Sequence, residues 1–160
     1  MPSTYTPIAT TTLGSAASSV TFSSISGSYT DLRIVYATTA SADAGNYIRY
    51  NSDSGSNYSR TGLYGNGSSA GSNRDTSSTG IYGPFTMSSA ITSNTIDIMN
   101  YSNTTTNKTC LVRAGAANNS TVASVGLWRS TAAITSVSIT CDGANFVSGS
   151  TFTLYGVKSA

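Results

Sequence analysis

The sequence lacks most of the side chains that enzymes use. It has no His, no Glu and no Gln, and its six acidic residues are all Asp. Charged residues make up 9% of the chain, whereas an average soluble domain has roughly 25%. Catalysis at neutral pH usually needs His, Glu, Asp, Lys or Cys in pairs, and a Ser nucleophile could find its base only in Lys108 or Lys158. We therefore expect no catalytic residues and a protein that is not an enzyme.

Metal and cofactor chemistry lacks its ligands as well. Without His and with only two Cys, the chain cannot build an ordinary zinc site. Residues 53–57 place oxygen atoms around a glycine, loosely like a calcium loop, but several carboxylates are missing, so an Asx turn is the better interpretation. Glycoside hydrolysis would need two Asp to converge from separate turns and strands. We expect no metal and no cofactor.

The sequence also gives no sign of a membrane or nucleic-acid partner. No apolar run approaches the roughly 18 residues of a spanning helix, and residues 1–5 do not resemble a signal peptide. The eight Lys and Arg residues are scattered singly, whereas nucleic-acid binding needs several cations on one face. We expect a protein that is made in a cytoplasm and binds neither.

The two cysteines, Cys110 and Cys141, each lie within an apolar strand pattern. We interpret them as small buried residues. A disulfide between them is the alternative, and it is disfavoured because a chain made in a cytoplasm starts out reduced.

What the chain does contain favours β-structure. Ten Tyr, four Phe, one Trp and many Thr, Val and Ile are present, and these residue types favour strands. Apolar residues recur at every second position, most clearly in residues 147–157 with Phe152 and Leu154, and in residues 32–39 with Leu32, Ile34 and Tyr36. The last strand should therefore lie between or beside strands formed earlier.

Spacings of roughly 12–15 residues between strand patterns predict an all-β fold. We expect a jelly-roll-type antiparallel β-sandwich of about 8–10 strands. Residues 51–60 should form turns, and residues 65–79 a long surface loop that is either functional or flexible. One helical turn could form at 16–19 or 88–91. Residues 13–160 should form one domain, and residues 1–12, with two prolines, a short extended N-terminal arm or an edge strand.

Aromatic residues are the remaining signal for a contact surface. Tyr58, Tyr64 and Tyr82 are candidates, because tyrosine buries much area and hydrogen bonds at one end. Three interpretations stay open for such residues: the sandwich core, a protein–protein contact, and stacking against sugar rings.

Several segments resemble one known family. They include Tyr-Thr-Pro-Ile-Ala-Thr at 5–10, Gly-Leu-Trp-Arg-Ser at 126–130 and Gly-Ser-Thr-Phe-Thr-Leu-Tyr-Gly at 149–156. Over most of its length the chain resembles virion structural proteins of tailed phages, many of them from phages of cyanobacteria and other aquatic bacteria and often called tail-fibre-like. The resemblance implies a β-sandwich of jelly-roll type, displayed on the particle exterior as an oligomer, and no catalytic residues.

Residues 1–12 are too short for the shaft of a tail fibre, so we expect a capsid decoration (cement) protein. It would be made in the host cytoplasm, bind the outside of the phage head as a homotrimer, and contact the major capsid protein. Tyr5, Ile8 and Leu13 would anchor the arm on a neighbour. The alternative is a fibre or spike tip that binds host-surface glycans, with Tyr58, Tyr64 and Tyr82 in the contact.

Overall fold

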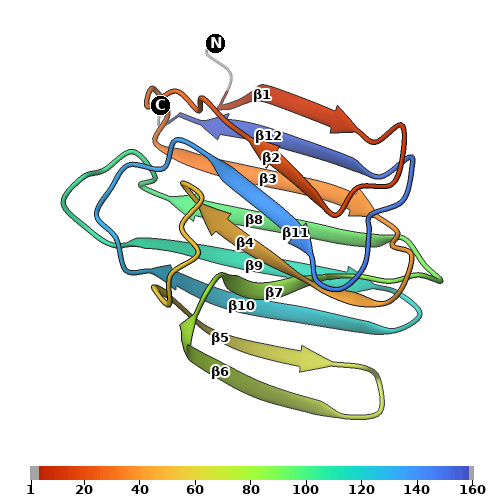
Figure 1. Ribbon diagram of the computed structural model, residues 1–160. Coiled ribbons are helices and arrows are strands. Elements are labelled where there is room, and N and C mark those ends of the chain that lie inside the picture. Colours follow the sequence, from red (N-terminus) through yellow and green to blue (C-terminus); the bar gives the residue numbers. More distant parts are fainter. Residues whose placement is uncertain (1–3, 159–160) are drawn as a thin grey trace.

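The computed structural model describes residues 4–158, which form an all-β protein without an α-helix (Figure 1). Every pair of neighbouring strands is antiparallel. The strands are β1 (Tyr5–Thr12), β2 (Ser19–Phe22), β3 (Asp31–Thr38), β4 (Ala44–Tyr50), β5 (Tyr58–Gly65), β6 (Ala70–Ser78), β7 (Ile81–Thr86), β8 (Thr92–Met99), β9 (Lys108–Ala116), β10 (Ser120–Trp128), β11 (Val137–Cys141) and β12 (Thr151–Val157). The all-β prediction is confirmed.

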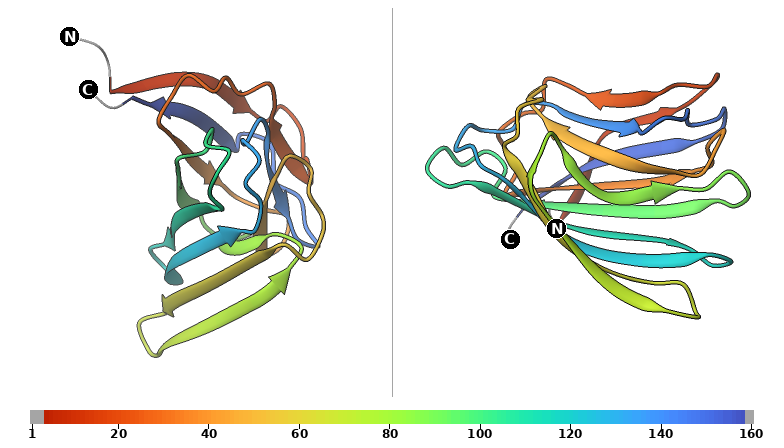
Figure 2. Two further views of the ribbon diagram at one scale, coloured as in Figure 1. Left: turned by 90° about the vertical axis from the view of Figure 1, so that its left-hand side faces the viewer. Right: turned by 60° about the horizontal axis from the view of Figure 1, so that its bottom comes forward.

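The strands form two sheets that pack as a β-sandwich. The large sheet has eight strands in the order β1-β12-β3-β8-β9-β10-β5-β6, and the small sheet has the order β2-β11-β4-β7. β7, the edge strand of the small sheet, contacts β9, β10 and β5 of the large sheet. The β5–β6 hairpin extends beyond β7, so part of its inner face is uncovered (Figures 1 and 2).

The pairing of strands is nested from the two ends of the chain inward. β1 pairs with β12, β2 with β11, β3 with β8, and β4 with β7. The hairpins β5–β6 and β9–β10 are inserted into this order, and they widen the large sheet by adding strands beside β8. β12 lies between β1 and β3, as the sequence predicted for the last strand.

Period-2 alternation builds the core between the sheets. Leu32, Ile34 and Tyr36 of β3 point inward and are at most 1% exposed. Phe152 of β12 stacks on Tyr36 with ring centroids 5.1 Å apart, and Phe146 meets Phe152 edge-on at 5.0 Å. Burying a large apolar side chain stabilises the fold by roughly 1.5–3 kcal/mol. Both cysteines are buried and free, which confirms the first interpretation of that pair.

A second aromatic cluster joins β4, β5 and β10. Tyr58 stacks on Trp128 at 6.3 Å between centroids, and Tyr50 meets Trp128 edge-on at 5.6 Å. The Tyr58 hydroxyl accepts a hydrogen bond from Tyr50 N and donates one to Asp53 O, both at 3.1 Å. Tyr58 is completely buried, so the prediction that it belongs to a contact surface is corrected.

The prediction of a long loop over residues 65–79 is wrong. Ala70–Ser78 forms β6, which pairs with β5, and only a short turn joins the two strands. Asn66 Oδ1 accepts hydrogen bonds from Ser68 N and Ser69 N, and Gly67 has a φ of 85°. β6 is an edge strand whose side chains are polar on both faces, so no apolar alternation marked it in the sequence. The segments 16–19 and 88–91 form no helical turn.

The described part of the expected arm is an edge strand of the domain. β1 pairs with β12 over its length, with a bulge between Pro7 and Ala9, and residues 1–3 lie outside the described residues. Ile8 and Leu13 are partly buried and pack against the core of their own chain. Tyr5 is 44% exposed, and its ring centroid lies 5.2 Å from the guanidinium carbon of Arg33.

Candidate binding surfaces

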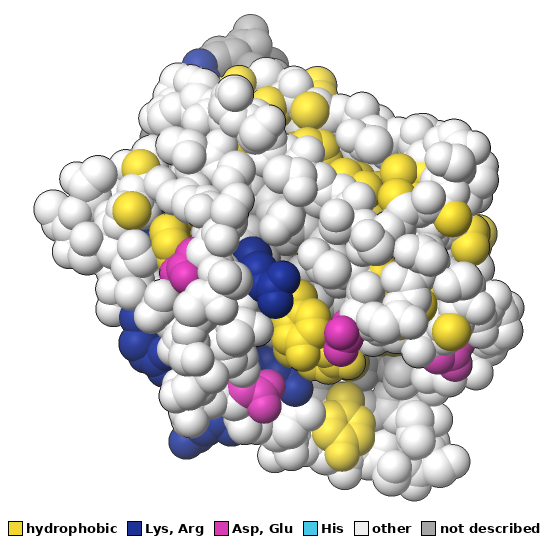
Figure 3. All heavy atoms as spheres, in the orientation of Figure 1, with side chains coloured by type: hydrophobic (Ala, Val, Ile, Leu, Met, Phe, Trp, Pro, Cys, Tyr) yellow, Lys and Arg dark blue, Asp and Glu magenta, His cyan; other side chains and the backbone are white. Residues whose placement is uncertain are grey.

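The structure brings two of the three candidate tyrosines together. Tyr64 of β5 and Tyr82 of β7 line a groove of about 220 Å³ between β7 and the β5–β6 hairpin. We call it the β7 groove, and its other walls include Arg60, Asn73 and Val122. Figure 3 shows this face of the molecule, where hydrophobic, basic and acidic side chains gather over β7 and the hairpin.

The groove forms because the C-terminal part of β5 lies beyond the edge of the small sheet and is not covered by it. Tyr58, Arg60 and Tyr64 alternate along β5 and share its inner face. Their exposed fractions rise along the strand, at 0%, 9% and 44%. The small sheet covers the first residue but ends at β7, which leaves Tyr64 open to solvent.

Arg60 and Tyr82 hold each other in place. Arg60 Nε donates to Asp75 Oδ2 at 2.6 Å, and its guanidinium carbon lies 5.2 Å from the Tyr82 ring centroid. Tyr82 also meets Tyr47 edge-on at 5.0 Å, and burial raises the Tyr82 pKa. A side chain at Gly45 would overlap the Tyr82 hydroxyl, so the glycine on β4 allows the ring to lie flat across that strand.

The hairpin register sets the rest of the groove. Tyr64 lies opposite Gly71 on β6 and covers it, because a β-carbon at Gly71 would be 2.6 Å from Tyr64 Oη. Asn73 lies opposite Gly62 on the same face, and its side chain is exposed. Arg60, Asn73 and Asp75 could not be predicted as one group from the sequence, because only the pairing of β5 with β6 puts them on one face.

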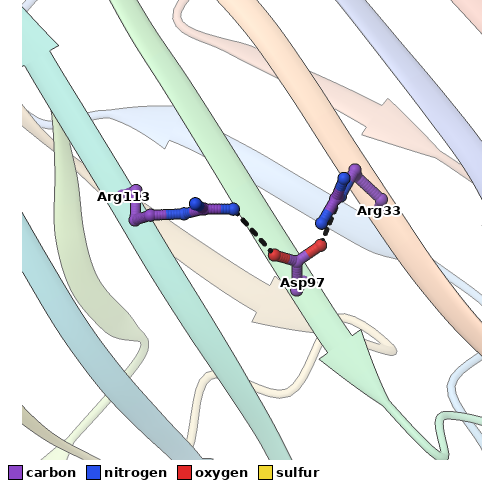
Figure 4. A network of polar contacts seen from close by, with 3 residues as sticks. All are labelled: Arg33, Asp97 and Arg113. Atoms are coloured by element: carbon purple, nitrogen blue, oxygen red, sulfur yellow. Dashed lines mark hydrogen bonds and ion pairs between the residues drawn. The ribbon is translucent and has the colours of Figure 1, made fainter.

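The opposite face of the large sheet carries an ion network (Figure 4). Asp97 of β8 lies between Arg33 of β3 and Arg113 of β9. Its Oδ1 is 2.5 Å from Arg33 Nε, and its Oδ2 is 3.5 Å from Arg113 Nη2. The hydrogen bond to Asp97 raises the Arg33 pKa. Because Arg113 is 67% exposed, its pair with Asp97 contributes little to stability. The network of two arginines and one aspartate carries one net positive charge.

Apolar side chains surround the network on the same face. Val35, Leu63, Leu111 and Val125 are 40–64% exposed, and we call them the sheet-face patch. Leu63, Leu111 and Val125 line a shallow hollow of about 680 Å³. Leu111 lies directly between Asp97 and Val125 in register. This patch was not predicted from the sequence, although consecutive apolar residues at 110–112 and 122–123 are a signal of strands that are apolar on both faces.

Most of the Asp side chains make hydrogen bonds or ion pairs within the chain. Asp53 Oδ1 accepts from Gly55 N at 2.8 Å, which makes the Asx turn indicated by the sequence. Asp43 accepts from Ser88, and Asp75 and Asp97 pair with arginines. Within residues 4–158, no three His, Cys, Asp or Glu side chains are grouped as metal ligands.

Comparisons with known proteins do not identify a family for this chain. No protein-family model matches the chain, and the search of curated proteins finds no match. No helix in the described part of the chain is long and apolar enough to cross a membrane.

Proposed function

We propose that this is a virion structural protein that acts by binding alone: a capsid decoration (cement) protein on the outside of a phage head, where it stabilises contacts between capsomers. The observation that carries the proposal is the sheet-face patch, a broad open sheet surface with four exposed apolar side chains. Exposed apolar patches of a few hundred Å² commonly mark interaction sites. The patch surrounds the Arg33–Asp97–Arg113 network, in which the carboxylate is already paired with both arginines, and paired charges cost less to bury than isolated ones.

The strand order also supports the proposal. Without the inserted hairpins, each sheet keeps four strands, in the orders β1-β12-β3-β8 and β2-β11-β4-β7. We infer a jelly roll, because that fold arises when a long nested hairpin rolls up into two sheets, and it is common in viral capsid proteins. The motifs at 5–10, 126–130 and 149–156, which resemble those of phage virion proteins, agree with this inference.

The contact would be made by the sheet face rather than by adding a strand at β1. Pro7 offers no backbone donor, and the bulge next to it disturbs the outer edge of β1. Prolines and bulges are features that protect edge strands from pairing. The major capsid protein is the proposed partner on the particle, and the protein itself would assemble as a homotrimer.

Locating the protein in an image of the intact virion tests the function directly. Density for the sandwich should lie on the outer surface of the head, between capsomers. Density confined to the tail, or none on the particle, would contradict the proposal.

A binding assay with undecorated heads tests the surface. Leu111→Ser combined with Val125→Ser should lower the occupancy of added protein on heads at least tenfold. Ile91→Ser is the matched control, since Ile91 is 71% exposed and lies outside the patch. Equal occupancy for both variants would mean that the patch is not the contact.

A further inference from the structure

We propose that the β7 groove binds the ring of a neutral sugar, a pyranose unit of a surface glycan. The inference goes beyond the structural role on the particle and does not depend on it. It rests on two tyrosine rings, an amide and a charge-neutral Arg–Asp pair placed around one hollow.

The aromatic rings supply the apolar part of the site. One face of a pyranose ring exposes several C–H groups, which pack well against a flat aromatic ring. Tyr64 offers such a ring at 44% exposure, and half-buried Tyr82 lines the same groove. Aromatic residues give large contact area with few rotatable bonds.

Both rings are fixed before any ligand arrives. Arg60 and Tyr47 hold Tyr82, and the glycine at 45 leaves room for it. Tyr64 rests over Gly71 on the paired strand. A preformed site loses little conformational entropy on binding, which favours affinity.

Polar groups beside the rings match sugar hydroxyls. Asn73 has an exposed amide that can both donate and accept hydrogen bonds. Arg60 and Asp75 add donors and acceptors from one ion pair, held at 2.6 Å. A few placed polar groups around an apolar surface are typical of small-molecule sites.

The charge of the groove selects neutral sugars over acidic ones. The carboxylate of Asp75 compensates the guanidinium of Arg60, so no unpaired cation is left there to bind a sugar carboxylate. Arg74 belongs to the other face of the hairpin, because it pairs with Thr61 in register, and its Nε donates to Thr61 Oγ1. Arg49, on the far side of Tyr47, donates to Thr79.

The size of the hollow sets the expected affinity. At about 220 Å³ it falls below the 300–1,000 Å³ of typical ligand pockets, so it holds about one ring. We expect dissociation constants in the millimolar range for a single site, and stronger attachment when several copies bind one glycan surface.

The test is a titration of the isotope-labelled protein followed by amide NMR shifts. The probes are the neutral disaccharides maltose, lactose, cellobiose and chitobiose, and the acidic trisaccharide sialyllactose. At least one neutral probe should cause saturable shifts confined to residues 60–64, 71–75, 82–85 and 120–122. Tyr64→Ala should weaken that binding at least tenfold. Tyr5→Ala should leave it unchanged, because Tyr5 is equally exposed, at 44%, but lies on the distant strand β1.

Asn73→Ala provides a second variant in case Tyr64→Ala disturbs the hairpin. Its side chain is exposed, so the fold should be unaffected while binding falls several-fold. The proposal is overturned if no neutral probe gives saturable shifts up to about 50 mM, well above millimolar dissociation constants. It is equally overturned if only sialyllactose binds, if the shifts lie elsewhere, or if both variants bind like the unmodified protein.

Discussion

Trp128 donates a hydrogen bond of 2.7 Å from its indole Nε1 to Oδ2 of Asp53, a residue 75 positions earlier. The indole is buried, at 3% exposure, and Asp53 also closes the turn before β5 through Gly55 N and the Asn57 amide. The Trp128 bond is the main reason why the Asp53 pKa is lowered. One carboxylate thus ties the loop after β4 to the end of β10.

Replacing Asp53 should therefore destabilise the fold. Asp53→Ala leaves the buried indole N–H without its acceptor, and we expect the free energy of unfolding to fall by about 1–3 kcal/mol. Asp53→Asn keeps an acceptor oxygen and should cost less. Urea unfolding of both variants, with and without Trp128→Phe, measures the coupling. A full cost for Asp53→Ala in the Trp128→Phe background would show that the pair contributes nothing.

High pH should weaken the fold through its buried tyrosines. Burial raises the Tyr58 pKa to about 12, raises the Tyr36 and Tyr50 pKa values, and raises the Cys110 pKa to about 11. At a pH between the ordinary and the raised pKa, each of these groups is still protonated in the folded state but has lost its proton in the unfolded chain. Their stabilisation is complete below about pH 9 and is lost as the pH rises through the raised values, by about 1.4 kcal/mol per pH unit and per group.

Urea midpoints at several pH values between about 8 and 12 check this dependence. The midpoint should fall with increasing steepness above about pH 10. Tyr58→Phe removes one of the groups, so its curve should be shallower in that interval, although the variant starts from lower stability because two hydrogen bonds are lost. A slope unchanged by Tyr58→Phe would contradict the role assigned to that hydroxyl.

Lys108 should be needed for the loops at one end of the sandwich. The residue is 0% exposed, and its Nζ donates to Thr106 O at 2.7 Å and to Thr131 O at 3.1 Å. Burial lowers the Lys108 pKa. Lys108→Met keeps the apolar stem but leaves both carbonyls without the donor, and we expect a loss of about 1–3 kcal/mol.

The matched control is Lys158→Met, because Lys158 is exposed and should change stability by no more than about 0.5 kcal/mol. Thermal unfolding of the two variants gives the comparison. Equal melting temperatures would show that the two hydrogen bonds of Lys108 only offset the cost of burying its charge.

A methyl group at position 45 should displace the Tyr82 ring. Gly45→Ala places a β-carbon where the Tyr82 hydroxyl lies, and such overpacking costs about 1–3 kcal/mol. Gly14→Ala is the control, since nothing lies within 4 Å of its added carbon. Denaturant unfolding should separate the two, and the sugar-induced shifts of the β7 groove should weaken for Gly45→Ala alone. Similar stability for both variants would mean that Tyr82 moves aside freely.

Part of the binding surface could be foreseen from residue type, and part could not. Tyr58, Tyr64 and Tyr82 are chemically alike and equally plausible in the sequence. Their different burial follows from where the small sheet ends over β5, which no local pattern records. Arg60 was not selected because residues 51–60 were predicted to form turns, and Asn73 and Asp75 were not selected because residues 65–79 were predicted to form a loop, so none of the three had an assigned face.

The sequence by itself determined the all-β fold class and the residues that face the core in the strands with the clearest apolar alternation. Alternating apolar residues specify an inward and an outward face locally, so β3 and β12 could be predicted, and the absence of His and Glu could be read directly. Only the tertiary structure decided that residues 5–12 form an edge strand and not a free arm, that 70–78 form β6, and which tyrosines meet. Strand pairing joins residues far apart along the chain, and its register depends on packing that a single segment does not encode.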